Sequence, residues 1–129
     1  MIEIDTKSLV PIYSQLIFQI KRAIVLGQLA HGQSMPSVRA LAGDIGVNMH
    51  TINKAYKLLV DEGVLVQEKK GFKVSEKEVI RTSVENCQQI QQKIDELLID
   101  SLIFGIDLDA LMETRLHVMK GCDTDDFDD

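Results

Sequence analysis

The chain has 129 residues, of which 45% are hydrophobic and 26% charged, and its formal net charge is −6. This composition is typical of a folded soluble protein, and the length excludes a large enzyme. No apolar run approaches the roughly 18 residues of a membrane helix, and the start MIEIDTKSLV does not resemble a secretion signal, so we expect a cytoplasmic protein without a membrane partner.

The first two predicted helices are marked by an apolar repeat and by residues suited to helix ends. Pro11 opens the first helix, since its missing N–H costs nothing there, and Gly27 ends it. Ser37 caps the second helix, over residues 38–45, and Gly46 ends it. The positions expected to face the core recur at threes and fours: Ile12, Leu16, Ile20 and Ile24, then Val38, Leu41, Ala42 and Ile45.

A third helix of about 14 residues is predicted after Asn48, which is a good amino-terminal cap, and it ends at Gly63. Its expected inward face holds Ile52, Ala55, Tyr56, Leu59 and Val60. After Gly63 the pattern alternates, and the strand positions are Val64, Val66, Phe72 and Val74, with a turn at residues 69–71. Residues 35–73 therefore predict a helix-turn-helix followed by a two-stranded wing.

From about Glu76 the helical period returns and predicts a long helix that ends at about Phe104. Gly105 breaks this helix, and Asp107 can cap a short last one. The expected fold is thus mainly α with a small β-wing. Its predicted parts are a winged helix-turn-helix DNA-binding domain (1–75), a helical dimerisation region (76–121) and an acidic tail (122–129) that is too charged to fold alone.

Charge is distributed unevenly between the two halves of the chain. Residues 1–75 carry nine Lys and Arg against six Asp and Glu, whereas residues 76–129 carry five against fourteen. A surface that binds phosphate is therefore expected only in the first half.

A recognition helix presents its amino-terminal end to base edges in the major groove, so polar side chains are needed there. The third helix begins with such residues. Arg39 can reach a phosphate or a guanine edge, and Ser37 with the first-turn amides can hold a phosphate. The candidate DNA contacts are Ser37, Arg39, Asn48, His50, Thr51, Asn53, Lys54, Tyr56, Lys69 and Lys70.

Some of these assignments have a second interpretation. Asn48 and Thr51 can serve only as a cap or a local hydrogen-bonding group. Tyr56 can touch a phosphate through its hydroxyl or belong to the core. Lys69 and Lys70 at the wing tip can meet DNA or simply solubilise the turn.

The helix-turn-helix carries a motif of Pro36, Ser37, Arg39, Leu41, Ala42, Gly46, Val47, Thr51, Ala55, Tyr56, Glu62, Gly63 and Leu65. With this motif, residues 11–74 resemble the winged helix-turn-helix domain of the GntR family of bacterial transcription regulators. The Val-Asn-x-x-Thr turn and the short second half resemble its YtrA-like branch, in which two helices serve dimerisation. Two positions depart from the family pattern: Met49 replaces a base-contacting arginine of many members, and Lys69 replaces the first glycine of the wing.

The resemblance implies a transcriptional regulator, expected to be a repressor, that binds double-stranded DNA as a homodimer, with transporter operons as targets. A twofold dimer demands a near-palindromic operator. The apolar stripe assigned to dimerisation is Ile80, Val84, Ile90, Ile94, Leu97 and Leu98. The alternative is that this helix folds back on its own winged domain.

Two other functions stay open: a winged-helix adaptor that binds protein and not DNA, and a switch that responds to an effector or a metal. No nucleophile with its base, glycine-rich phosphate loop or calcium-loop spacing is present, so we expect neither an enzyme nor a resident metal or cofactor. Cys87 and Cys122 lie far apart and are expected to be reduced thiols. The operator and any small-molecule effector are not specified by these patterns.

Overall fold

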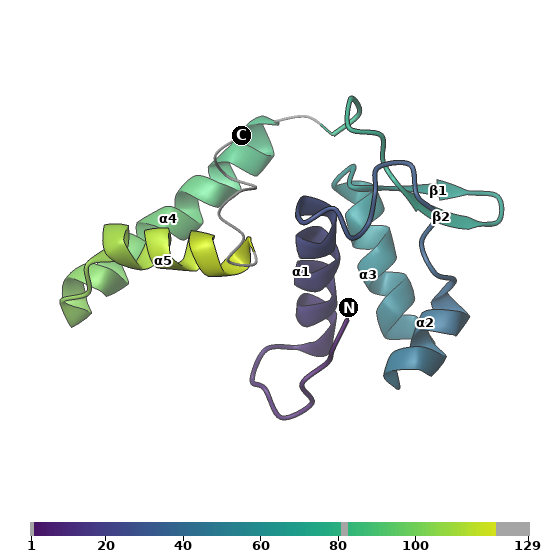
Figure 1. Ribbon diagram of the computed structural model, residues 1–129, viewed down its shortest axis with the longest axis horizontal. Coiled ribbons are helices and arrows are strands. Elements are labelled where there is room, and N and C mark those ends of the chain that lie inside the picture. The colour runs from purple at the N-terminus through teal and green to yellow at the C-terminus, as the bar shows by residue number, and fades with distance from the viewer. Residues whose placement is uncertain (1, 81–82, 121–129) are drawn as a thin grey trace. The chain divides into compact units, whose positions relative to one another are not determined.

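The computed structural model describes residues 2–80 and 83–120, in which it contains five helices and one two-stranded sheet (Figure 1). The elements are α1 (Ile12–Val25), α2 (Val38–Ile45), α3 (Met49–Asp61), β1 (Leu65–Glu68), β2 (Gly71–Val74), α4 (Val84–Phe104) and α5 (Leu108–Met119). The chain forms two compact units, Met1–Arg81 and Thr82–Asp129. Among the described residues, none of the helices combines the length and the apolar character of a membrane span. The predicted fold class, mainly α with a small wing, is confirmed.

The core of the first unit is built from α1, α2, α3 and the sheet, and α3 contacts the other three (Figure 1). Ile52, Ala55, Tyr56 and Leu59 of α3 are fully buried, as their spacing predicts, whereas Val60 is only partly buried. Full burial of a large apolar side chain contributes about 1.5–3 kcal/mol. The inner side of α3 therefore fixes this helix firmly to the domain.

The ends of α2 and the start of α3 are fixed by the predicted residues. Ser37 Oγ accepts the Ala40 N–H at 3.0 Å, and Asn48 Oδ1 accepts the His50 N–H at 2.7 Å. Gly46 takes a φ of 68° in the turn between the two helices, a left-handed conformation that favours glycine. Local hydrogen bonds thus set the geometry of the helix-turn-helix.

The wing is an antiparallel hairpin whose turn consists of Lys69 and Lys70, and it pairs Leu65 with Val74. Directly opposite residues share a face of the sheet, so Leu65 is the inward residue of β1. The expected alternation through Val64 and Val66 is therefore out of phase. Val64 precedes the strand, and Val66 is half-buried on the other face.

The segment before α2 also pairs with the wing, which the sequence pattern did not indicate. Ser34 forms an antiparallel bridge with Lys73, and the Met35 N–H donates to the Phe72 carbonyl at 2.8 Å. This pairing joins the wing to the start of α2. Both are regions where we expected DNA contacts.

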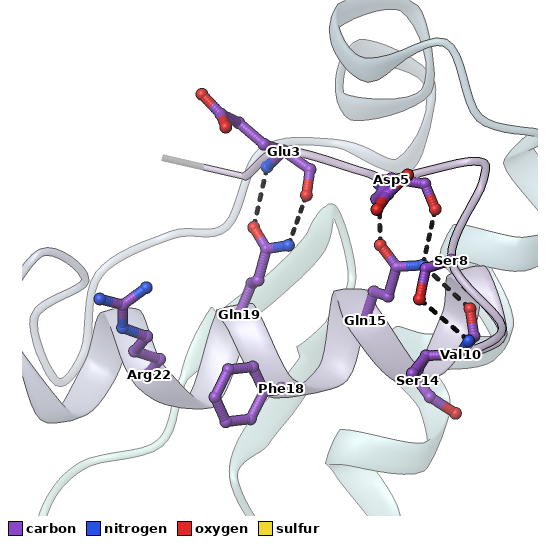
Figure 2. Close-up of a pocket in the computed structure, with 9 residues that line it drawn as sticks. All are labelled: Glu3, Asp5, Ser8, Val10, Ser14, Gln15, Phe18, Gln19 and Arg22. Atoms are coloured by element: carbon purple, nitrogen blue, oxygen red, sulfur yellow. Dashed lines mark hydrogen bonds between the residues drawn. The ribbon is translucent and has the colours of Figure 1, made fainter. Parts of the chain in front are cut away.

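Residues 3–10 lie along α1 and are held there by two glutamines one turn apart (Figure 2). Gln15 accepts the Asp5 N–H and donates to the Asp5 carbonyl, both at 2.9 Å, and Gln19 makes the same pair of bonds with Glu3. Each side-chain amide supplies the donor and the acceptor that a neighbouring strand would otherwise offer to the backbone of this segment. The start of the chain is therefore part of the first unit.

The second unit contains α4 and α5. Ser83 caps α4 by accepting the Asn86 N–H at 3.0 Å, so the expected helix start near Glu76 is wrong. The Val79 N–H instead donates to the Glu76 carbonyl in a turn, and Ile80 lies outside the helix. A capping serine satisfies a first-turn amide, which explains why the helix starts there and not farther upstream.

The end of α4 and the start of α5 follow the prediction. Gly105 has a φ of 66° and ends α4, and Asp107 caps α5 by accepting the Ala110 N–H at 3.2 Å. The acidic tail predicted for residues 122–129, with Cys122, lies outside the described residues.

Candidate nucleic-acid interface

The leading turns of α3 present polar side chains at the surface of the first unit. Asn48, His50 and Lys54 are exposed, and Thr51 and Asn53 are partly exposed. On the inner side of the same helix, Ile52, Ala55, Tyr56 and Leu59 are buried, and α3 contacts α1, α2 and β1. The predicted separation of a polar outer side from an apolar inner side is therefore confirmed.

The capping residues are partly occupied by their structural role. Asn48 Oδ1 and Ser37 Oγ each accept a backbone N–H, so the Asn48 amide group and the Ser37 hydroxyl hydrogen remain as donors. The N–H groups of Val38 and Arg39 have no acceptor among the described residues. Such first-turn amides attract anions, which makes the start of α2 suitable for a phosphate.

Three positive side chains of the first unit are already engaged. Lys21 pairs with Glu62 at 3.0 Å, and Lys73 lies 3.5 Å from Glu68. The Lys54 ammonium lies 4.9 Å from the ring centroid of Tyr13, a cation–π contact worth about 0.5–1 kcal/mol at an exposed site. Lys54 therefore has to leave this contact to reach a phosphate.

The other candidate cations are available. Arg39, Lys69 and Lys70 are exposed and have no ion pair among the described residues. Lys57 shares these properties and was omitted from the predicted contacts. Its spacing of four from Asn53 places it on the same side of α3, a signal that the sequence already contained.

Tyr56 is a correction to the predicted contacts. Its side chain is 0% exposed, its hydroxyl donates to the Pro36 carbonyl at 2.9 Å, and its ring packs edge-on against Phe72. Burial raises its pKa to about 12. Tyr56 therefore supports the segment before α2 and has no free hydroxyl to offer DNA.

Tyr56 should also make the stability of the domain depend on alkaline pH. The stability linked to the protonated Tyr56 hydroxyl is fully present below the unfolded pKa of 10.0 and is lost as the pH rises through the folded pKa of about 12. In this range the unfolded chain loses the proton while the folded protein keeps it, so rising pH favours unfolding. Two pKa units correspond to about 2.7 kcal/mol. Urea unfolding from pH 7 to 12 should show this loss in the free energy of unfolding.

The matched variant is Tyr56→Phe. It should be about 1 kcal/mol less stable at pH 7, since the bond to Pro36 is lost, but its free energy of unfolding should fall less between pH 10 and 12. Equal pH slopes in the two proteins would contradict the role of burial.

Other parts of the described chain offer little chemistry. The open pocket beside α1 is lined mostly by polar residues (Figure 2). Two of them, Gln15 and Gln19, already form hydrogen bonds through their side-chain amides with the backbone of residues 3–10. Across residues 2–80 and 83–120, no three His, Cys, Asp or Glu side chains gather to hold a metal ion. Cys87 is an exposed free thiol.

The chain is similar to known proteins both in sequence and in structure. The HTH-type transcriptional repressor YtrA of Bacillus subtilis (strain 168) is 36% identical over 114 residues, covering 88% of each chain. The crystal structure of a transcriptional antiterminator from Listeria monocytogenes EGD-e has a TM-score of 0.87 and 30% identity, and covers 94% of this chain and 93% of that chain. AraR(DBD) in complex with operator ORX1 has a TM-score of 0.51 and 31% identity, and covers 55% of this chain and 89% of that chain.

A family model also matches the chain. Residues 12–74 match the model described as bacterial regulatory proteins, gntR family, and this range contains α1, α2, α3 and the wing. The match and the likeness to the Bacillus repressor confirm the resemblance seen in the helix-turn-helix motif. The chain therefore belongs to the GntR family of bacterial regulatory proteins.

Proposed function

We propose that this protein is a cytoplasmic repressor without enzymatic activity that binds a near-palindromic operator as a homodimer. The observation that carries the proposal is the exposed polar start of α3, held by a fully buried inner side and accompanied by the unpaired Arg39. The operator complex of AraR and the repressor name of the Bacillus relative support the same function.

In the proposed complex, the start of α3 enters the major groove and reads base edges through His50, Thr51 and Asn53. Ser37 and the free amides of α2 hold one phosphate, and Lys69 and Lys70 reach others from the wing. Phosphate contacts supply affinity and register, whereas the polar residues of α3 supply sequence preference. A bound dimer represses by excluding polymerase from the promoter.

Dimerisation is assigned to the second unit, because its helices expose apolar side chains that a lone helix pair would leave in water. Ile90 is 58% exposed, Ile94 43% and Leu97 52%. An open apolar groove of about 550 Å³ adds to this surface; it is lined by Leu97, Leu108, Leu111, Met112, Glu113, Arg115, Leu116 and Met119. Exposed apolar surfaces of this kind mark protein interfaces.

The dimerisation stripe keeps Val84, Ile90, Ile94, Leu97 and Leu98 but not Ile80, which lies outside α4. Apolar exposure in the described residues is not confined to this stripe: near the end of α4, Leu102, Ile103 and Phe104 are each more than 70% exposed. On this basis we propose the division into a DNA-binding domain and a dimerisation region, and we propose the acidic tail from its charge in the sequence alone. The occupant we propose for this surface is a second copy of the chain, whose own apolar stripe would cover it in a twofold dimer.

Selection of duplexes from a random pool by the purified full-length protein tests the proposal. We expect enrichment of a motif in two inverted halves whose centres lie about one duplex turn, 34–36 Å, apart. A duplex of the same length and composition with a scrambled motif is the control. Folded dimeric protein that enriches no sequence would contradict the proposal and favour a protein-binding adaptor.

A further inference from the structure

Met49 is an exception to the burial of large apolar side chains in α2 and α3, two helices that the structure describes completely. Among the large apolar residues of these helices, it alone is substantially exposed, at 43%. It is the first residue of α3, between the capping Asn48 and the exposed His50. An apolar side chain therefore lies at the end of α3 that is assigned to base reading.

The neighbours of Met49 and the chemical groups in the major groove of DNA together indicate what the Met49 side chain can contact. Asn48 Oδ1 is already committed to the His50 N–H. The major groove offers one apolar group, the C5 methyl of thymine, beside its donors and acceptors. A methionine thioether is flexible and polarizable and donates no hydrogen bond, so it suits that methyl group and not a guanine edge.

We propose that Met49 contacts the C5 methyl of a thymine in each operator half-site and thereby sets a preference for thymine at that position. This inference rests on the proposed DNA binding and adds a specificity-determining residue to it. The loss of water from both apolar groups supplies the preference. A cytosine at the same position has no methyl group and gains nothing from this contact.

The test replaces each thymine of the selected operator in turn by deoxyuridine, which removes only the methyl group. The dissociation constant of the full-length protein is measured for each duplex. At one half-site position the substitution should weaken binding about fourfold, the value of one buried methyl-sized group. Substitution in both half-sites should weaken binding about fifteenfold, since distant contacts add.

The same duplexes are then measured with Met49→Ala and with two controls. In Met49→Ala the deoxyuridine substitution should have no effect, whereas Met49→Leu should keep the dependence on the methyl group. Val25→Ala removes apolar surface from a residue of α1 that is 70% exposed, and it should behave as the unchanged protein does. Unchanged thermal midpoints should show that all three variants are folded.

Two outcomes overturn the inference while DNA binding stands. In one, deoxyuridine weakens the unchanged protein and Met49→Ala equally; in the other, no thymine methyl affects the affinity of the unchanged protein. A protein that selects no duplex at all overturns the proposed function instead, and this inference with it. The two failures are therefore distinguishable.

Discussion

Replacement of Ile90 by glutamate is expected to dissociate the proposed homodimer and to lower its operator affinity by about a hundredfold or more. Ile90 is 58% exposed in the single chain and belongs to the apolar stripe of α4. An unpaired carboxylate buried in an apolar interface costs several kcal/mol, which exceeds what one residue contributes to the contact. Light scattering should give the mass of one chain at micromolar concentration.

The control for this variant is Gln92→Glu, which introduces the same charge on the same helix. Gln92 is exposed and lies two residues from Ile90, on a different side of α4. This variant should remain dimeric and bind the operator normally. If Ile90→Glu also stays dimeric with unchanged helix content, the stripe of α4 is not the interface.

Features set by neighbouring residues were predictable from the sequence. The bounds of α2 match the prediction, and the capping roles of Ser37, Asn48 and Asp107 are those expected from residue type. These contacts span two or three residues, and the apolar repeat of a helix extends over only a few turns. The buried side of α3 was predictable for the same reason.

Features that depend on partners far away in the chain were not predictable from the sequence. The residue type of Tyr56 leaves open whether its hydroxyl is free, and the partner that decides it, the Pro36 carbonyl, is 20 residues away. The pairing of Ser34 with Lys73 joins residues that lie 39 positions apart. The Gln15 and Gln19 contacts with residues 3–10 involve amide groups that are common on any helix surface.

The start of α4 shows a different limit. The apolar period continues upstream through Ile80, so periodicity alone extends the helix too far. A helix start also needs acceptors for its first N–H groups, and Ser83 supplies one. Within the candidate interface, Arg39 and Lys54 are both exposed, but only Lys54 is engaged, through its contact with the Tyr13 ring. Residue type alone does not reveal this difference.

Arg39→Ala is expected to weaken operator binding by about tenfold to a hundredfold without destabilising the protein. Arg39 lies one turn into α2, is exposed and forms no ion pair among the described residues, so the cost falls on DNA contact and not on folding. Electrophoretic mobility shifts should give the loss in affinity. The thermal midpoint should stay unchanged.

Arg22→Ala is the matched control, because it removes the same charge from an exposed arginine on α1. Equal losses in the two variants would mean that net charge, and no specific contact of Arg39, governs affinity. The salt dependence identifies what Arg39 contacts. A phosphate contact adds about one unit to the slope of log affinity against log salt, so its loss lowers that slope, whereas loss of a guanine contact relaxes sequence preference at one position of each half-site.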